Sequence, residues 1–134
     1  MSQLSFLSIA QNKKILRCEH FLNDMKKIIP WNKVCDLIRP YYSAGTLGRK
    51  PMPMLMMTKI YCLQQWYQLS DPAMEEAIYD RNSFQKFLEL DLLEGNVPDE
   101  TTILHFRHLL EKHDLMEKIF NMINKYLEKK GAFT

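Results

Sequence analysis

Paired acidic residues are the first side chains of this sequence whose spacing could support chemistry. Asp71 and Glu75 are four residues apart, as are Glu76 and Asp80, so each pair would share one face of a helix. Carboxylates that converge in this way can hold the two divalent ions of phosphoryl transfer, about 3.5–4 Å apart. A structural role explains them better, because carboxylates in a first helical turn complement the helix dipole. We therefore predict no catalytic residue in this chain.

Two histidines suggest a metal site. His105 and His108 are three residues apart and could approach one ion from the same helix face. No cysteine or carboxylate completes a recognisable ligand set, and the three cysteines form no CxxC pair. We expect both histidines to be solvated or packed, and we predict no metal site and no cofactor.

A stripe of hydrogen-bonding residues suggests a nucleic-acid interface. In a helix predicted over residues 100–112, apolar side chains recur on one side and form a buried stripe. None of the four residues on the opposite side is acidic, and all can hydrogen-bond to phosphates or base edges. A plain solvated face remains the alternative. The four residues are Thr101, His105, His108 and Lys112.

Two other basic segments could contact DNA. Arg49 and Lys50 stand in a segment rich in glycine and proline, and a short basic arm of this kind can enter a minor groove. Lys13 and Arg17 give the first predicted helix a basic face that could neutralise phosphates. The alternatives are an ordinary surface loop and ordinary solvated side chains.

Charge is distributed unevenly along the 134 residues, although the formal net charge is only +2. Residues 1–70 hold ten Lys and Arg against three Asp and Glu, whereas residues 71–100 hold two against nine. This asymmetry is compatible with a basic face that binds nucleic acid. Alternatively, the two regions partly neutralise each other within the fold.

Helical periodicity predicts an all-α fold, a single compact bundle of about seven helices. Apolar residues make up 46% of the chain, and the four glycines are too few for a turn-rich β-barrel. No apolar run approaches the roughly 18 residues that a membrane span needs. Residues 1–11 are expected to form a flexible arm and residues 12–134 the helical domain. The predicted helices cover residues 12–29, 31–39, 54–67, 71–80, 83–90, 100–112 and 114–131.

Several local features of this bundle can also be predicted. The helix over residues 54–67 is apolar around most of its circumference and should be central. Ser70, Asp99 and Asp114 are expected to cap the helices that follow them, and Arg107 to pair with a carboxylate. Residues 83–90 and 100–112 would form a helix-turn-helix-like pair, although the turn is longer than usual.

Four segments, in order, resemble the amino-terminal region of bacterial insertion-sequence transposases of the InsH type. The resemblance extends from about residue 15 to the end of the chain. It departs at residues 48–51, where family members often have G-R-P-P and this chain has G-R-K-P. The segments are FLNDMKKIIPW (21–31), GRKPMP (48–53), QQWYQLSDPAMEEAIYD (64–80) and VPDETTILHFRHLLEKH (97–113).

The resemblance implies that catalysis belongs to another part of the protein. In the family, this helical region precedes an RNase H-like domain whose Asp, Asp and Glu triad holds divalent metal ions. By this resemblance we expect the chain to stop before that triad, as a truncated or frame-split transposase would. By itself it is expected not to be an enzyme, and Mg²⁺ is expected only for the missing domain.

The resemblance also implies a function and partners. The chain would recognise the terminal inverted repeats of the element as double-stranded DNA, position them and contribute to a homodimer. Its expected location is the cytoplasm, without membrane contact. The alternative is a helical protein-interaction or dimerisation module, or a non-catalytic regulator of transposition.

Overall fold

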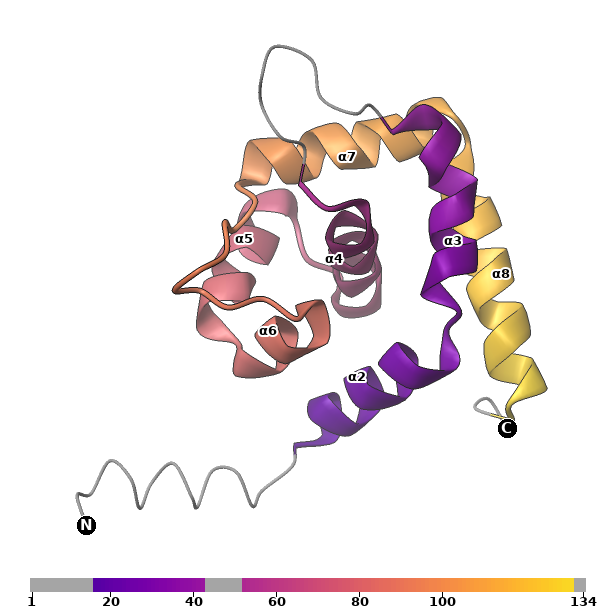
Figure 1. Ribbon diagram of the computed structural model, residues 1–134, viewed down its shortest axis with the longest axis horizontal. Coiled ribbons are helices and arrows are strands. Elements are labelled where there is room, and N and C mark those ends of the chain that lie inside the picture. The colour runs from indigo at the N-terminus through magenta and orange to yellow at the C-terminus, as the bar shows by residue number, and fades with distance from the viewer. Residues whose placement is uncertain (1–15, 43–51, 132–134) are drawn as a thin grey trace.

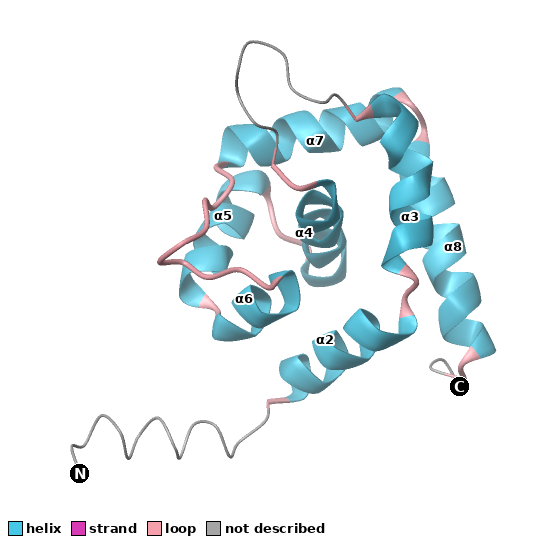
Figure 2. Cartoon of the chain, in the orientation of Figure 1, coloured by secondary structure: helices cyan, strands magenta, loops and turns pink. Residues whose placement is uncertain are grey.

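Helix α4, Met54–Tyr67, lies at the centre of the structure with the other helices around it (Figure 1). The computed structural model describes residues 16–42 and 52–131, and these contain seven α-helices, one 3-10 helix and no strand (Figure 2). The predicted all-α fold is confirmed. The other helices are α2 (Arg17–Ile28), α3 (Trp31–Ile38), η1 (Arg39–Tyr41), α5 (Asp71–Asp80), α6 (Asn82–Leu88), α7 (Glu100–Lys112) and α8 (Leu115–Lys129).

The composition of α4 explains its central place. Eight consecutive residues, from Met57 to Gln64, are buried, so no face of the helix is left to solvent along this stretch. Helices α3, α5, α6 and α7 all pack against it. A helix that is apolar around its circumference is stable only when neighbours cover every side.

The outer helices form a ring around α4. Helix α2 packs on α6, α6 on α5, α5 on α7, α7 on α8, and α8 on α3 (Figure 1). Each outer helix therefore needs only one apolar stripe, which faces inward. The stripe of α8 is the clearest example, with buried residues at every fourth position: Leu115, Ile119, Ile123 and Leu127.

Two of the three predicted N-caps are confirmed. Ser70 Oγ accepts a hydrogen bond from the Ala73 amide at 3.2 Å, and Asp99 Oδ1 accepts one from the Thr102 amide at 2.8 Å. Both capping residues have extended backbone, which aims the side chain at the free amides of the first turn.

The prediction that Asp114 caps α8 is wrong. Only His113 and Asp114 connect α7 to α8, and Asp114 takes a left-handed conformation with φ 52°. Its side chain makes no capping hydrogen bond, because a capping side chain needs extended backbone. Aspartate is one of the few residues other than glycine that tolerate the left-handed region. Here it reverses the chain instead.

The predicted helix-turn-helix-like pairing of α6 with α7 also needs correction. Helix α7 makes its main contacts with α5, α4 and α8, whereas α6 makes its own with α2, α5 and α4. Residues 89–99 separate the two helices, and this connection is too long to hold them as a compact pair. The helix that positions α7 is therefore α5.

Candidate nucleic-acid interface

The predicted stripe on α7 faces solvent. Thr101, His105, His108 and Lys112 are all exposed in the structure. At 100° per residue they fall within an arc of about 60°. The opposite side of the helix is buried against α4 and α5 through three apolar residues, Ile103, Phe106 and Leu110.

Helix α5 holds the beginning of α7 through the carboxylate of Glu75. Glu75 Oε1 accepts a hydrogen bond from the Glu100 amide at 2.6 Å, so the first turn of α7 is capped by Asp99 and also by a neighbouring helix. A negative charge at a helix N-terminus is favourable because the free amides there carry partial positive charge. Glu75 thus has a structural role, as expected of this acidic pair.

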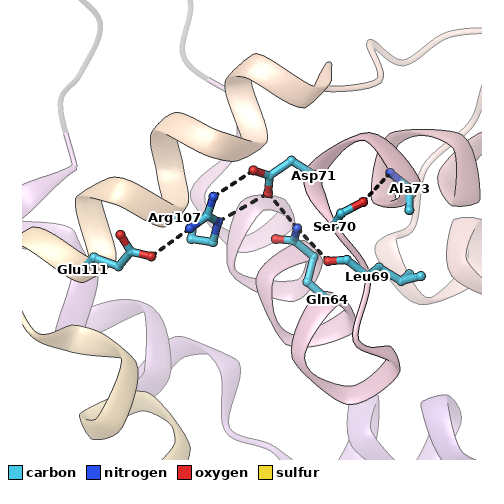
Figure 3. A network of polar contacts seen from close by, with 7 residues as sticks. All are labelled: Gln64, Leu69, Ser70, Asp71, Ala73, Arg107 and Glu111. Carbon is cyan, nitrogen blue, oxygen red and sulfur yellow. Dashed lines mark hydrogen bonds and ion pairs between the residues drawn. The ribbon is translucent and has the colours of Figure 1, made fainter.

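Arg107 anchors the middle of α7 on the other acidic residue of that pair (Figure 3). Its Nη2 lies 2.9 Å from Asp71 Oδ2, and its Nη1 lies 2.8 Å from Glu111 Oε1. Gln64 Nε2 of α4 donates to Asp71 Oδ1 at 2.8 Å. The hydrogen bond from Arg107 holds the pKa of Asp71 below its ordinary value and raises that of Arg107. The expected pairing of Arg107 with a carboxylate is confirmed.

Aromatic contacts hold the other end of α7. His113 stacks on Tyr41 of η1, with 4.0 Å between ring centroids. Tyr42 packs edge-on against Phe106, and its hydroxyl donates a hydrogen bond to the Met52 carbonyl oxygen. The chain on both sides of residues 43–51 is therefore fixed beside α7.

The other predicted DNA contacts are placed differently. Arg17 is exposed at the start of α2, which lies across α4 from α7 (Figure 1). The structure therefore does not bring Arg17 beside the α7 stripe. Lys13, Arg49 and Lys50 lie outside the described residues.

Ion pairs compensate part of the charge asymmetry of the sequence. Lys26 Nζ lies 2.9 Å from Glu89 Oε1 and joins α2 to the end of α6. Lys86 Nζ lies 3.6 Å from Glu19 Oε1 and joins the same two helices. Of the two pairs, Lys26–Glu89 joins a base of residues 1–70 to an acid of residues 71–100, so the two segments partly neutralise each other at the α2–α6 contact.

Helix α8 carries a basic surface that is not among the predicted DNA contacts. Three lysines, Lys118, Lys125 and Lys129, recur at i, i+7 and i+11, which places them within an arc of about 40°. All three are exposed, and α3 adds Lys33 beside them through a hydrogen bond to Tyr126. The helical periodicity of α8 is enough to predict that the three lysines share one face. Only the structure shows that Lys33 of α3 lies beside them.

Neither a metal site nor a membrane-spanning segment is found in the described part of the chain. Within residues 16–42 and 52–131, no group of three or more His, Cys, Asp or Glu side chains is arranged to hold a metal ion. The helices formed by these residues are too short or too polar to cross a bilayer.

The helical bundle and the stripe on α7 define a candidate DNA-binding domain. Residues 10–109 match the family described as transposase domain (DUF772), which covers most of the chain. The chain therefore belongs to this transposase domain family. The match reaches from before α2 into α7 and ends ahead of Lys112 and α8. No solved structure matches the chain.

Proposed function

We propose that this chain is the DNA-binding and assembly region of an insertion-sequence transposase of the InsH type. It would recognise the terminal inverted repeats of the element. The observation that carries the proposal is the α7 stripe: Thr101, His105, His108 and Lys112 are exposed on one helix that is fixed at both ends. Membership of the transposase domain family supports it.

The residue types assign roles within the stripe. Lys112 would neutralise a phosphate, while Thr101 and the two histidines would hydrogen-bond to base edges or to the backbone. Thr101 to Lys112 spans about 16 Å along the helix axis, and an α-helix fits the major groove of B-DNA. The polar contacts would set register, and the phosphate contacts would supply affinity that depends on salt.

The basic segment around Arg49 and Lys50 would act on the same duplex. Met52 is hydrogen-bonded to Tyr42, which packs on α7. We assign this segment to the adjacent minor groove. Arg17, at the start of α2, would add a phosphate contact, and so would Lys13.

In this proposal these helices bind DNA and do not cut it. Asp71 and Glu75 are held by Arg107 and by the Glu100 amide, so both carboxylates already have structural partners. Strand cleavage and its divalent ions would belong to a catalytic domain outside these helices. The chain on its own would occupy the element ends in the cytoplasm.

The test measures binding of the full chain to labelled duplexes by fluorescence anisotropy. One duplex carries the inverted repeat that flanks the coding sequence, and the other has the same composition in scrambled order. Replacing His105, His108 and Lys112 together by alanine should remove the preference for the inverted repeat. Lys86→Ala removes one positive charge from α6 and should leave that preference unchanged. If the unmutated chain binds neither duplex at low salt, the proposal fails.

An apolar groove supports the second candidate, a helical interaction module. The groove lies between α2, α4 and α8, and Phe21 is 37% exposed at its edge. Sedimentation of the chain without DNA tests this candidate, since an interaction module should self-associate and ignore both duplexes. The apolar residues that line the groove are Phe21, Met25, Trp66, Phe120 and Leu127.

A further inference from the structure

A cluster of lysines and one tyrosine lies where α3 packs against α8. Lys33 of α3 donates a hydrogen bond from Nζ to the Tyr126 hydroxyl oxygen of α8 at 2.9 Å. The same nitrogen lies 5.4 Å from the centroid of the Tyr126 ring. Lys129 follows Tyr126 by three residues on α8, so their side chains are neighbours on the helix surface. Both lysines are exposed.

The direction of the Lys33–Tyr126 hydrogen bond leaves the phenol free to donate. A protonated lysine has only donors, so the Tyr126 oxygen accepts and its own hydrogen points elsewhere. The adjacent ammonium also holds the pKa of Tyr126 below its ordinary value, because positive charge favours the phenolate. The same polarisation makes the hydroxyl a stronger donor. Lys33 keeps two further N–H groups for another acceptor.

The lysines of this cluster form no ion pair within the described part of the chain. No carboxylate oxygen of the described residues lies within 4.0 Å of Lys33, Lys125 or Lys129. Lys26, by contrast, is paired with Glu89. Lys125 and Lys129 are four residues apart on α8, and like charges at this spacing repel. A polyanion lying across α8 would relieve that repulsion.

We propose that Lys33, Tyr126 and Lys129 form a phosphate-binding cluster for the backbone of duplex DNA. Lys125 adds a third positive charge, about 6 Å from Lys129 along the axis of α8. The inference rests on the proposed function and adds a contact surface to it. Such contacts supply affinity without sequence information, which separates this cluster from the α7 stripe.

The side chains favour a phosphodiester over a carboxylate partner. The cluster has no arginine, so it offers separate point charges and not the planar fork that holds one carboxylate or one phosphate by two hydrogen bonds. Lysines spaced along a helix, joined by a polarised hydroxyl, instead match a row of negative charges with several acceptor oxygens each. A nucleic-acid backbone presents such a row.

The experiment compares the full chain with the double variant Lys33→Gln/Lys129→Gln on the inverted-repeat and scrambled duplexes. Each lost phosphate contact should weaken binding to both duplexes roughly five- to tenfold at about 0.1 M salt. The slope of log affinity against log salt should become shallower by about 0.9 per contact. The preference for the inverted repeat should stay unchanged, because the cluster reads no bases.

Two further variants separate binding from folding. Tyr126→Phe removes only the hydroxyl and should weaken binding roughly two- to tenfold, as the loss of one hydrogen bond does. The melting temperature should change little, because the Lys33–Tyr126 hydrogen bond is exposed. The matched control Lys86→Gln removes a positive charge from α6 and should keep the salt slope of the unmutated chain. If Lys33→Gln/Lys129→Gln unfolds, Tyr126→Phe alone decides the outcome.

Three results would overturn the inference. If the double variant is folded and keeps the affinity and salt slope of the unmutated chain, the cluster contacts no phosphate and the proposed function stands. If the double variant loses binding only to vesicles of anionic lipid, the cluster serves a membrane surface. If the unmutated chain binds no duplex at low salt, the proposed function and this inference fail together.

Discussion

Arg107 of α7 and Asp71 of α5 form an ion pair that holds the two helices together on a side of α7 away from its exposed stripe. Arg107 Nη2 lies 2.9 Å from Asp71 Oδ2, and the two residues are 36 positions apart in the sequence. Arg107 and the stripe lie on different sides of α7, so this pair leaves His105 and His108 facing solvent. Gln64 of α4 holds Asp71 from a third helix.

Asp71→Asn should therefore destabilise the bundle. The Asp71 side chain is 13% exposed, and a hydrogen bond to a charged group contributes about 1.5–3 kcal/mol. We expect the free energy of unfolding, measured by urea denaturation at pH 7, to fall by about that amount. Glu111→Gln is the matched control, because its pair with Arg107 is more exposed and should contribute about 0.5 kcal/mol or less.

The same variant has a characteristic pH dependence. The pKa of Asp71 is lower in the folded state than in the unfolded chain, so its stabilisation is present above the unfolded value of about 3.9. It is lost as the pH falls through the folded value. The difference between Asp71→Asn and the unmutated chain should thus be largest near neutral pH and shrink in acid. A difference that grows below pH 4 would contradict the assignment.

The helix caps allow a second prediction. Ser70→Ala and Asp99→Ala should each lower the free energy of unfolding by about 1 kcal/mol, because each removes a capping hydrogen bond. Asp114 should behave differently because it is left-handed. Asp114→Gly should be more stable than Asp114→Ser by about 1 kcal/mol, since only glycine takes this conformation without strain.

These two variants at position 114 distinguish the observed turn from a capping role. Serine is a good N-cap, and glycine is slightly worse, so a capping position would give the opposite order of stability. Thermal melts of both variants measure the difference directly. Equal melting temperatures, or a more stable serine variant, would show that the α7–α8 connection is not left-handed at this residue.

Local sequence patterns predicted the helices well because their causes are local. Helix α4 has the predicted bounds, as Pro53 precedes it and the chain leaves the helix in a left-handed conformation at Gln68. Ser70 and Asp99 accept hydrogen bonds from amides three residues away, so a short stretch of sequence is enough to predict both caps. The stripe on α7 follows from helical periodicity alone.

Contacts between distant residues could not be predicted in the same way. The Lys33–Tyr126 hydrogen bond joins positions 93 residues apart, so neither residue is notable in its own segment. The packing of α7 on α5 instead of α6 depends on which helix offers partners to Arg107 and Glu100. The left-handed turn at Asp114 arises because two residues must reverse the chain, and an Asp before a helix equally suggests a cap.

Chelation of divalent ions should leave DNA binding by this chain intact. The proposed contacts use lysine, histidine and threonine side chains, none of which needs a metal to bind phosphate or bases. Anisotropy titrations with EDTA and with added Mg²⁺ should differ only by the ordinary competition of Mg²⁺ for phosphates. A complete loss of binding in EDTA would show that a metal ion bridges the chain and the DNA.

Lys59 provides a prediction for the core. Its side chain is 3% exposed, its Nζ donates to the Phe87 carbonyl oxygen at 3.1 Å, and that nitrogen lies 5.6 Å from the Trp31 ring centroid. Burial lowers the pKa of Lys59, because the charged form loses its hydration. Lys59→Met exchanges this costly charge for an apolar chain of similar length but leaves the Phe87 carbonyl without its donor. These effects oppose each other.

The stability of the unmutated chain relative to Lys59→Met should rise with pH. The cost of the buried charge is fully present below the folded pKa of Lys59 and disappears as the pH rises toward the unfolded value of about 10.4. We expect the free energy of unfolding of Lys59→Met to be within about 1.5 kcal/mol of that of the unmutated chain at pH 7. By pH 9.5 the unmutated chain should have become more stable relative to Lys59→Met. Urea denaturation of both proteins measures this difference in the free energy of unfolding. Tyrosines and cysteines also titrate in alkali, but both proteins contain them, so their effects largely cancel in the difference. Lys59→Ala should cost about 2–5 kcal/mol at either pH through the cavity it leaves. If the unmutated chain instead becomes less stable relative to Lys59→Met as the pH rises, the charged form of Lys59 is net stabilising in its buried position.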